Sequence, residues 1–119
     1  MTTKEIADRL VELCKKGDFE TAQKELFATD ATSIEPYASP MFEKETTGLD
    51  NILEKGQKFQ SMVETMHSLD VSEPLVATNS FVATMQMDAT MKEKGRMNMT
   101  ELCVYTVKDG KIASEQFYV

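Results

Sequence analysis

The sequence predicts an α+β domain in which three helices come first and a curved antiparallel sheet follows. Up to residue 62, apolar side chains recur at helical spacing in three segments. From residue 67 onward, apolar and polar side chains alternate along four long segments that are separated by turn-forming residues. A chain of 119 residues has room for one hydrophobic core, so we expect a single domain over residues 1–119, with the helices on one side of the sheet.

Three helices are predicted, over residues 3–16, 19–27 and 49–62. In each of them the apolar side chains are three or four residues apart and therefore lie on one face. Gly17 ends the first helix, because glycine readily takes the left-handed conformation that follows a helix. Gly56 lies inside the third helix, where glycine costs about 1 kcal/mol relative to alanine.

The remaining elements are strands. A short strand is expected over residues 32–35, and Pro36 stops it. A loop over residues 37–47 is expected to cover one end of the fold. The four long strands are predicted over residues 67–77, 80–92, 96–108 and 111–119, with turns near Asn79, Gly95 and Gly110.

Composition excludes several classes of function. A net charge of −7 argues against a surface for nucleic acid or for an anionic membrane, because such surfaces need clustered Lys and Arg. No apolar run approaches the roughly 20 residues that span a bilayer, and the first residues do not resemble a signal peptide, so we expect the cytoplasm. Cys14 and Cys103 match no metal or redox spacing and are expected to be reduced core thiols. His67 is the only histidine and has no metal-ligand spacing around it, so no metal or other cofactor is expected.

Strand alternation and hairpin register predict which side chains share a face of the sheet. A turn that pairs Lys92 with Met97 places Asp88 opposite Glu101. The same register places Gln86 opposite Cys103 and Thr84 opposite Tyr105, and the preceding hairpin adds His67 beside Thr90. We therefore expect a face on which carboxylates are surrounded by residues that contact a ligand.

The opposite face is predicted to be apolar and rich in methionine. It would carry Met85, Met87, Leu102 and Val104. An exposed apolar patch of this size is uncommon on a monomer, so we expect a homodimer that pairs through this face.

The register of the last hairpin is ambiguous. A two-residue Asp-Gly turn would bring Gln116 and Tyr118 onto the carboxylate face. A three-residue Lys-Asp-Gly loop, with Gly110 in the left-handed conformation, would bring Glu115 and Phe117 there instead.

Gathered carboxylates suit acid-base chemistry. Like charges held together in a partly dry site raise at least one pKa, which gives a group that can hold a proton near neutral pH. Glu35, at the end of an apolar-flanked strand and just before Pro36, is a candidate base for removing a proton next to a carbonyl group. The alternatives are a solvated Glu35, a structural or solvated His67, and carboxylates that are solvated at the sheet rim or paired with Lys92 and Arg96.

Two segments carry a resemblance to a known family. The run from Glu12 to Pro36 contains Gly-Asp at 17–18 and Phe-Ala-Thr-Asp-Ala-Thr at 27–32, and residues 107–112 read Val-Lys-Asp-Gly-Lys-Ile. Together they resemble the nuclear transport factor 2-like superfamily, in particular its SnoaL-like and ketosteroid-isomerase-like branches. The resemblance implies a cone-shaped, cystatin-like fold with a pocket between helices and sheet. It also implies that Glu35 stands where the isomerases carry their catalytic base, and it favours the hairpin register that turns Glu115 toward the pocket.

The resemblance to the isomerases fails at two positions. By local match, Leu10 and Cys103 stand where the isomerases place a tyrosine and a protonated aspartate that hold the oxyanion, so a steroid isomerase is not expected. We expect a SnoaL-like protein that binds a small organic ligand, and, if it is an enzyme, an isomerase, cyclase or dehydratase that needs no cofactor. Glu35 would be the base, and Asp88, Glu101 or Glu115 would be the acid or the orienting group. The alternatives are a ligand-binding domain without catalysis and a dimeric adaptor.

Overall fold

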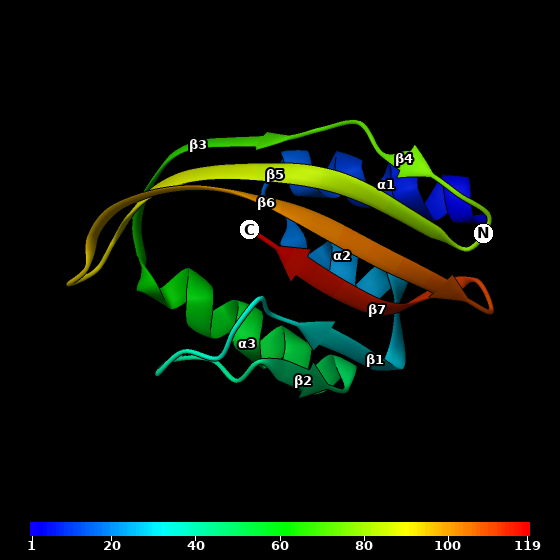
Figure 1. Cartoon of the computed structure of the whole chain (residues 1–119), viewed down its shortest axis with the longest axis horizontal. Coiled ribbons are helices and arrows are strands. Elements are labelled where there is room, and N and C mark those ends of the chain that lie inside the picture. The colour runs from blue at the N-terminus through cyan, green and yellow to red at the C-terminus, as the bar shows by residue number, and fades with distance from the viewer.

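Three helices cover one side of a curved, seven-stranded sheet (Figure 1). The computed structural model describes residues 1–119. The helices are α1 (Thr3–Lys15), α2 (Phe19–Leu26) and α3 (Leu49–Met62). The strands are β1 (Phe27–Ile34), β2 (Glu45–Thr47), β3 (Val63–Val71), β4 (Leu75–Val76), β5 (Ser80–Met91), β6 (Gly95–Lys108) and β7 (Lys111–Tyr118). The strand order is β2-β1-β7-β6-β5-β3, and β4 pairs with the first residues of β5. The predicted α+β class is confirmed.

The helix boundaries follow from caps in the sequence. The Thr2 side chain accepts a hydrogen bond from the Glu5 backbone, and the Glu5 side chain accepts one from the Thr2 backbone, which forms a capping box at the start of α1. Gly17 has a φ of +74° and turns the chain after α1. Asp18 then caps α2 by accepting a hydrogen bond from the Thr21 backbone.

The sheet is mixed, whereas the sequence predicted a purely antiparallel one. Strand β1 begins directly at the end of α2 and runs parallel to β7, with Ser33 beside Glu115. The prediction extended the second helix to residue 27 and began the strand at residue 32, so it missed the first half of β1. The longer β1 matters because it brings Ser33 and the following Glu35 next to the C-terminal strand.

The β5–β6 hairpin has a different register from the predicted one. Strand β5 ends at Met91, which pairs with Gly95, so that Met85 lies opposite Glu101. Residues 92–94 form the turn, and it closes because Glu93 and Gly95 both take positive φ angles, of 66° and 80°. The observed partners of β5 are three residues from the predicted ones, and an odd shift turns every β5 side chain to the other face relative to β6.

This register overturns the predicted methionine-rich face. Met85 and Met87 share the inner face, toward the helices, with Glu101. Leu102 and Val104 lie on the outer face, where Leu102 is 40% exposed.

The last hairpin turns Glu115 and Phe117 to the inner face, as one of the two predicted registers did, but through a bulge rather than a three-residue loop. Its turn has two residues, Asp109 and Gly110, so the three-residue loop is wrong. An extra residue in β7, between the partners of Thr106 and Val107, then shifts the register by one. Through this bulge Glu115 pairs with Tyr105, and Phe117 pairs with Cys103, on the inner face.

The core lies between the helices and the inner face of the sheet. Its side chains with almost no exposure include Ile6, Leu26, Ile52 and Ile112. Cys14 and Cys103 are buried there as free thiols. A smaller cluster around Met87, Ala89 and Met91 packs against α3 and β3 farther along β5. No helix has both the length and the apolar character needed to cross a membrane.

Candidate functional site

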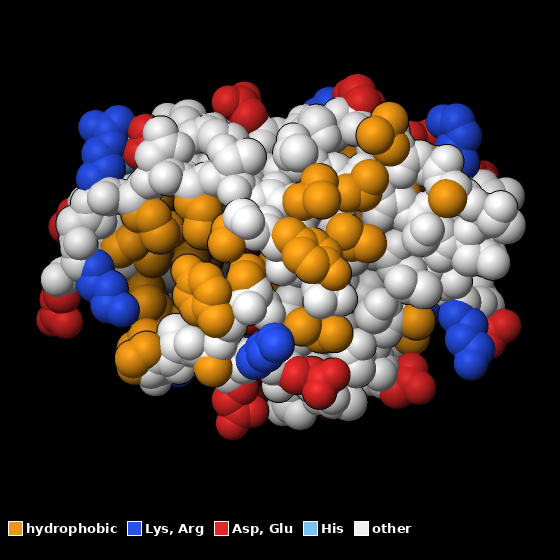
Figure 2. All heavy atoms as spheres, in the orientation of Figure 1, with side chains coloured by type: hydrophobic (Ala, Val, Ile, Leu, Met, Phe, Trp, Pro, Cys, Tyr) orange, Lys and Arg blue, Asp and Glu red, His pale blue; other side chains and the backbone are white.

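A cavity of about 510 Å³ lies between the three helices and the inner face of the sheet. It opens as a hollow with hydrophobic walls between the β5–β6 hairpin and α3, on the left of Figure 2. Most of its lining is hydrophobic, and the large apolar side chains include Phe19, Phe27, Phe42, Phe59, Phe117, Met85, Met87 and Met99. A volume of this size is in the range of cavities that hold small organic molecules.

The methionines in this wall are present because of the hairpin register. The observed β5–β6 pairing turns Met85, Met87 and Met99 toward the helices. Methionine side chains are unbranched and polarisable, so they adapt to ligands of different shape and stack on aromatic rings. The wall is therefore suited to a flat or flexible apolar molecule.

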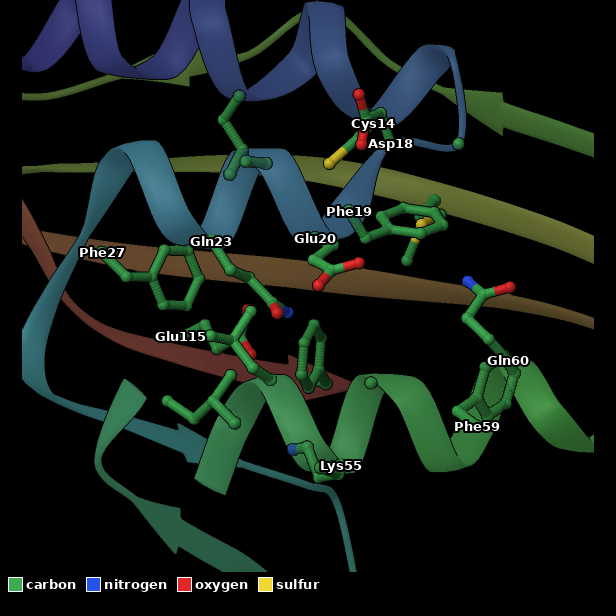
Figure 3. Close-up of a pocket in the computed structure, with 18 of the residues that line it drawn as sticks. Cys14, Asp18, Phe19, Glu20, Gln23, Phe27, Lys55, Phe59, Gln60 and Glu115 are labelled. Atoms are coloured by element: carbon green, nitrogen blue, oxygen red, sulfur yellow. The ribbon is translucent and has the colours of Figure 1, made fainter. Parts of the chain in front are cut away.

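Four glutamates interrupt the apolar lining; Glu20 lies on α2, and the other three lie on or directly after strands of the sheet. Glu35 follows the end of β1, Glu101 lies on β6, and Glu115 lies on β7. In Figure 3, Glu115 lies in the middle of the cavity, between side chains of α2 and α3. The structure thus places three of the four predicted catalytic carboxylates around one cavity.

Glu115 is the most deeply buried of the three and is only 5% exposed. Its Oε2 accepts a hydrogen bond of 2.7 Å from the Ser33 hydroxyl. Burial raises the pKa of Glu115 to about 7, the Ser33 hydrogen bond and Lys55 act in the opposite direction, and Glu35 adds to the rise. The carboxyl group can therefore hold or release a proton near neutral pH.

Lys55, on α3, connects the carboxylates. Its Nζ donates to the Ser33 hydroxyl at 2.7 Å and lies 3.2 Å from Oε2 of Glu35. The ammonium group also lies 5.9 Å from the centre of the Phe117 ring. Only 16% of the Lys55 side chain is exposed, so this cation is held at the cavity rather than in bulk water.

Glu101 differs from the other two carboxylates because it has no hydrogen-bond partner in the protein. Burial raises its pKa to about 7, repulsion from Glu35 and Glu115 adds to the rise, and Lys55 opposes it. A carboxyl group with a pKa near 7 and free oxygen atoms is available to exchange a proton with a ligand.

The fourth predicted catalytic carboxylate, Asp88, lies elsewhere. It is on the outer face, where Arg96 donates to both of its oxygens at 2.9 Å. The Arg96 guanidinium lowers the pKa of Asp88. Its assignment to the site was wrong because the β5–β6 register differs from the predicted one, and pairing with Arg96 is the alternative that the sequence analysis left open.

The register also moves two predicted ligand-binding residues to the outer face. His67 is exposed, and its Nε2 lies 2.6 Å from the Thr90 hydroxyl, so the predicted contact with Thr90 exists but faces away from the cavity. Gln86 donates to Asn98 at 2.8 Å.

Tyr105, Phe117 and Cys103 lie on the inner face. Tyr105 and Phe117 line the cavity, and the Tyr105 ring stacks on Phe81 with 4.8 Å between centroids. Cys103 is buried in the core and does not line the cavity.

Sequence reasoning missed Ser33 and Lys55. Lys55 had a signal, since it lies three residues after Ile52 and four before Phe59, on the apolar face of the third helix. Ser33 had none, because its role depends on the parallel pairing of β1 with β7. A third addition is Cys14, a cavity-lining thiol. Burial raises its pKa to about 12, so it is not a thiolate nucleophile at neutral pH.

No group of three or more His, Cys, Asp and Glu side chains could hold a metal ion.

Comparison with protein families identifies the group to which this architecture belongs. The model of the SnoaL-like domain matches residues 1–119. The chain belongs to the SnoaL-like family. A SnoaL-like protein from Mesorhizobium loti has 37% sequence identity, covers 100% of both chains and superposes with a TM-score of 0.92. It is described as a candidate SnoaL-like polyketide cyclase, with the words carbohydrate phosphatase in brackets.

Two more distant structures share the fold of this SnoaL-like domain. A Xanthomonas campestris protein with a cystatin-like fold has 14% identity over 99% of this chain and 90% of its own, with a TM-score of 0.83. A Catenulispora acidiphila protein with a ketosteroid isomerase-like fold has 19% identity over 99% and 87%, with a TM-score of 0.69. The sequence was also compared with curated proteins, and none matched. The family and the fold that the resemblance implied are therefore confirmed.

Proposed function

We propose that this SnoaL-like domain binds a small, mainly apolar organic molecule and catalyses proton transfer on it without a cofactor. The observation that carries the proposal is the meeting of Glu35, Glu101 and Glu115 at one apolar cavity, with Glu101 near a pKa of 7 and free of protein partners. Groups of this kind suit an isomerisation, cyclisation or dehydration that begins at a carbon next to a carbonyl group.

The roles follow from the surroundings of each carboxylate. Glu35 is paired with Lys55, so we assign it the role of the carboxylate that accepts the proton. Glu101 retains a proton up to about pH 7 and is assigned the return of that proton to the ligand. Glu115, held by Ser33 on β1, is assigned the orientation of the ligand and of Lys55.

The description of the Mesorhizobium loti relative contains two activities, and the cavity favours one of them. Five acidic residues and one basic residue line it. A phosphate ester is an anion, so this charge balance disfavours a carbohydrate phosphatase activity. A cyclase or isomerase acting on a neutral carbonyl compound agrees better with an apolar wall that carries carboxylates.

Exchange of hydrogen for deuterium tests the proposal before any product is known. A panel of aryl-substituted 1,3-diketones is incubated with the protein in D₂O, and loss of the proton between the two carbonyl groups is followed by NMR. We expect catalysed exchange, with a loss of roughly 100-fold or more in Glu35→Gln. Asp88→Asn, which changes a carboxylate on the outer face, should retain the activity. Binding of the diketones without catalysed exchange would contradict the enzymatic part of the proposal.

A second candidate function is the non-catalytic binding of a small cation. The excess of acidic over basic residues in the cavity favours it. The Catenulispora acidiphila protein was solved in complex with trimethylamine, although at 19% identity it shares only the fold with this chain. Tight, saturable binding of tertiary amines together with no diketone exchange would favour this function over catalysis.

We also propose that the chain pairs with a second copy through the outer face of the sheet. The sequence predicted an interface of Met85, Met87, Leu102 and Val104. Of these four residues, Leu102 and Val104 lie on the outer face. Tyr118 and Leu75 share this face and are also exposed, at 48% and 75%. Figure 2 shows hydrophobic side chains gathered over the middle of strands β5 to β7. The cytoplasmic location stays a prediction from the sequence.

A further inference from the structure

The cavity contains one cation with a hydrogen-bond donor to spare. Lys55 is the single basic residue in the lining. An ammonium group has three N–H donors, and the structure assigns two of them, to the Ser33 hydroxyl and to Glu35. The third donor has no protein acceptor, although the side chain is only 16% exposed.

The partners of Lys55 fix the position of this free donor. Ser33 is completely buried and is itself bonded to Glu115, so the hydroxyl cannot turn away without breaking both contacts. Glu35 holds the ammonium group from the other side at 3.2 Å. The Phe117 ring lies 5.9 Å away and belongs to the apolar wall. The ammonium group is thus preorganised beside the surface on which an apolar ligand would lie.

We propose that the third donor of Lys55 binds an oxygen atom of the ligand, which defines the ligand class as a flat or flexible apolar molecule with a carbonyl group at one end. The inference rests on the proposed function. Glu35 takes a proton from the carbon next to the carbonyl group, and the C–H electron pair moves into a carbon–carbon double bond. The carbonyl π electrons move onto oxygen, where the Lys55 ammonium stabilises the negative charge, and protonation of a carbon by Glu101 completes the reaction. The ligand keeps its atoms and its charge. Glu35 has then gained a proton and Glu101 has lost one, and proton exchange with water restores both groups.

A matched pair of probes isolates this hydrogen bond. 2-Acetylnaphthalene and 2-isopropenylnaphthalene both carry a trigonal carbon with one methyl group and have nearly the same shape, and only the first carries an oxygen acceptor. Binding is measured at pH 8.5, where carboxyl groups with pKa values of about 7 are mainly ionised and cannot donate. We expect the ketone to bind roughly tenfold more tightly than the hydrocarbon, because a hydrogen bond from a charged donor to a neutral acceptor increases the affinity by about that factor.

Variants at two positions of α3 provide the comparison. Lys55→Met should remove the preference for the ketone, and Lys55→Arg should retain it. Lys58→Met is the control, because Lys58 lies on the same helix, donates to the Met41 carbonyl and does not line the cavity. It removes a contact with the Phe42 ring but no donor from the lining. As a readout that needs no variant, the ¹⁵Nζ resonance of Lys55 in the unmodified protein should shift with the ketone and not with the hydrocarbon.

The outcomes separate the two proposals. A preference that survives in Lys55→Met, or a Lys55 resonance that does not respond to the ketone, would overturn the role of Lys55. Equal binding of the two probes would also overturn it, and would leave the apolar cavity as the ligand site. Failure of both probes to bind would contradict the proposed function and, with it, this inference.

Discussion

The two glutamates at the centre of the cavity owe their properties to burial more than to any single partner. Burial is the largest cause of the raised pKa at both Glu101 and Glu115. Lys55 opposes the rise at each of them but does not cancel it. One ammonium group therefore faces three carboxylates, and its charge is too small to offset their burial. Glu101 and Glu115 can as a result still hold protons near neutral pH.

Glu101→Gln should change how stability depends on pH. The pKa of Glu101 is about 7 in the folded protein and near 4.5 in the unfolded chain, so the folded state binds the proton more tightly. The unmodified protein gains stability from this proton below pH 4.5 and loses it as the pH rises toward 7. Glutamine does not titrate, so the variant should gain about 2 kcal/mol relative to the unmodified protein between pH 5 and pH 8. Urea denaturation at the two pH values measures the difference.

Asp30→Asn provides the control for this titration. Asp30 is an exposed carboxylate on β1, and its replacement should leave the pH dependence of the free energy of unfolding unchanged. If Glu101→Gln and the unmodified protein lose stability in parallel between pH 5 and pH 8, Glu101 does not hold its proton in the folded state.

At the residue scale, the sequence allowed the identity of the carboxylates to be predicted better than their partners. Glu35 and Glu115 were selected through family resemblance, and Glu101 through strand alternation. Lys55 and Ser33 were missed, because the contact between them depends on where α3 crosses β1. That crossing is a tertiary feature with no local pattern in the chain.

At the scale of elements, turns and bulges decide which side chains meet. A three-residue turn at 92–94 placed Asp88 on the outer face, and a single bulge in β7 brought Glu115 to the inner one. Alternation correctly predicts which residues of one strand share a face. It does not predict the register between strands, because one residue more or less in a turn moves the side chains of one strand to the other face of the sheet.

Helix α3 allows a test of its packing in which one substitution has opposite effects at two positions. A Cβ at Gly56 would lie 3.7 Å from Oε1 of Gln23, which is an ordinary contact, so Gly56→Ala should stabilise the protein by about 1 kcal/mol. Gly48, just before the helix, has a φ of +96°, so Gly48→Ala should destabilise by about 1 to 3 kcal/mol. Thermal or urea denaturation measures both. A destabilised Gly56→Ala variant would mean that α2 and α3 lie closer together than described.

At the scale of the whole molecule, the inner face of the sheet is covered by helices and the outer face is not. If two copies pair there, light scattering should give about 27 kDa, twice the 13.4 kDa of one chain. Leu102→Glu would place a charge in that interface and should give the single-chain mass. Met66→Glu, on β3 at the edge of the sheet, serves as the control. A mass of one chain for the unmodified protein would contradict the dimer.

The overall class and the order of elements were predictable because periodicity is strong in the helices and in the four long strands. The mixed pairing of β1 was not, since parallel neighbours lie far apart in the sequence and leave no hairpin signal. The cavity depends on the covering helices and on the pairing of β1. The helices cover the inner face of the sheet, and β1 brings Ser33, and Glu35 directly after it, close to the cavity.

The central claim is that the cavity between the helices and the sheet is the ligand site. The most direct measurement is a titration of protein labelled with ¹³C at its methionine methyl groups, using aryl ketones and 1,3-diketones. Met85, Met87 and Met99 line the cavity, whereas Met1 and Met66 do not. The account predicts that ligands shift the first three resonances and leave the other two in place. Shifts confined to Met1 and Met66, or no shift with any compound, would contradict it.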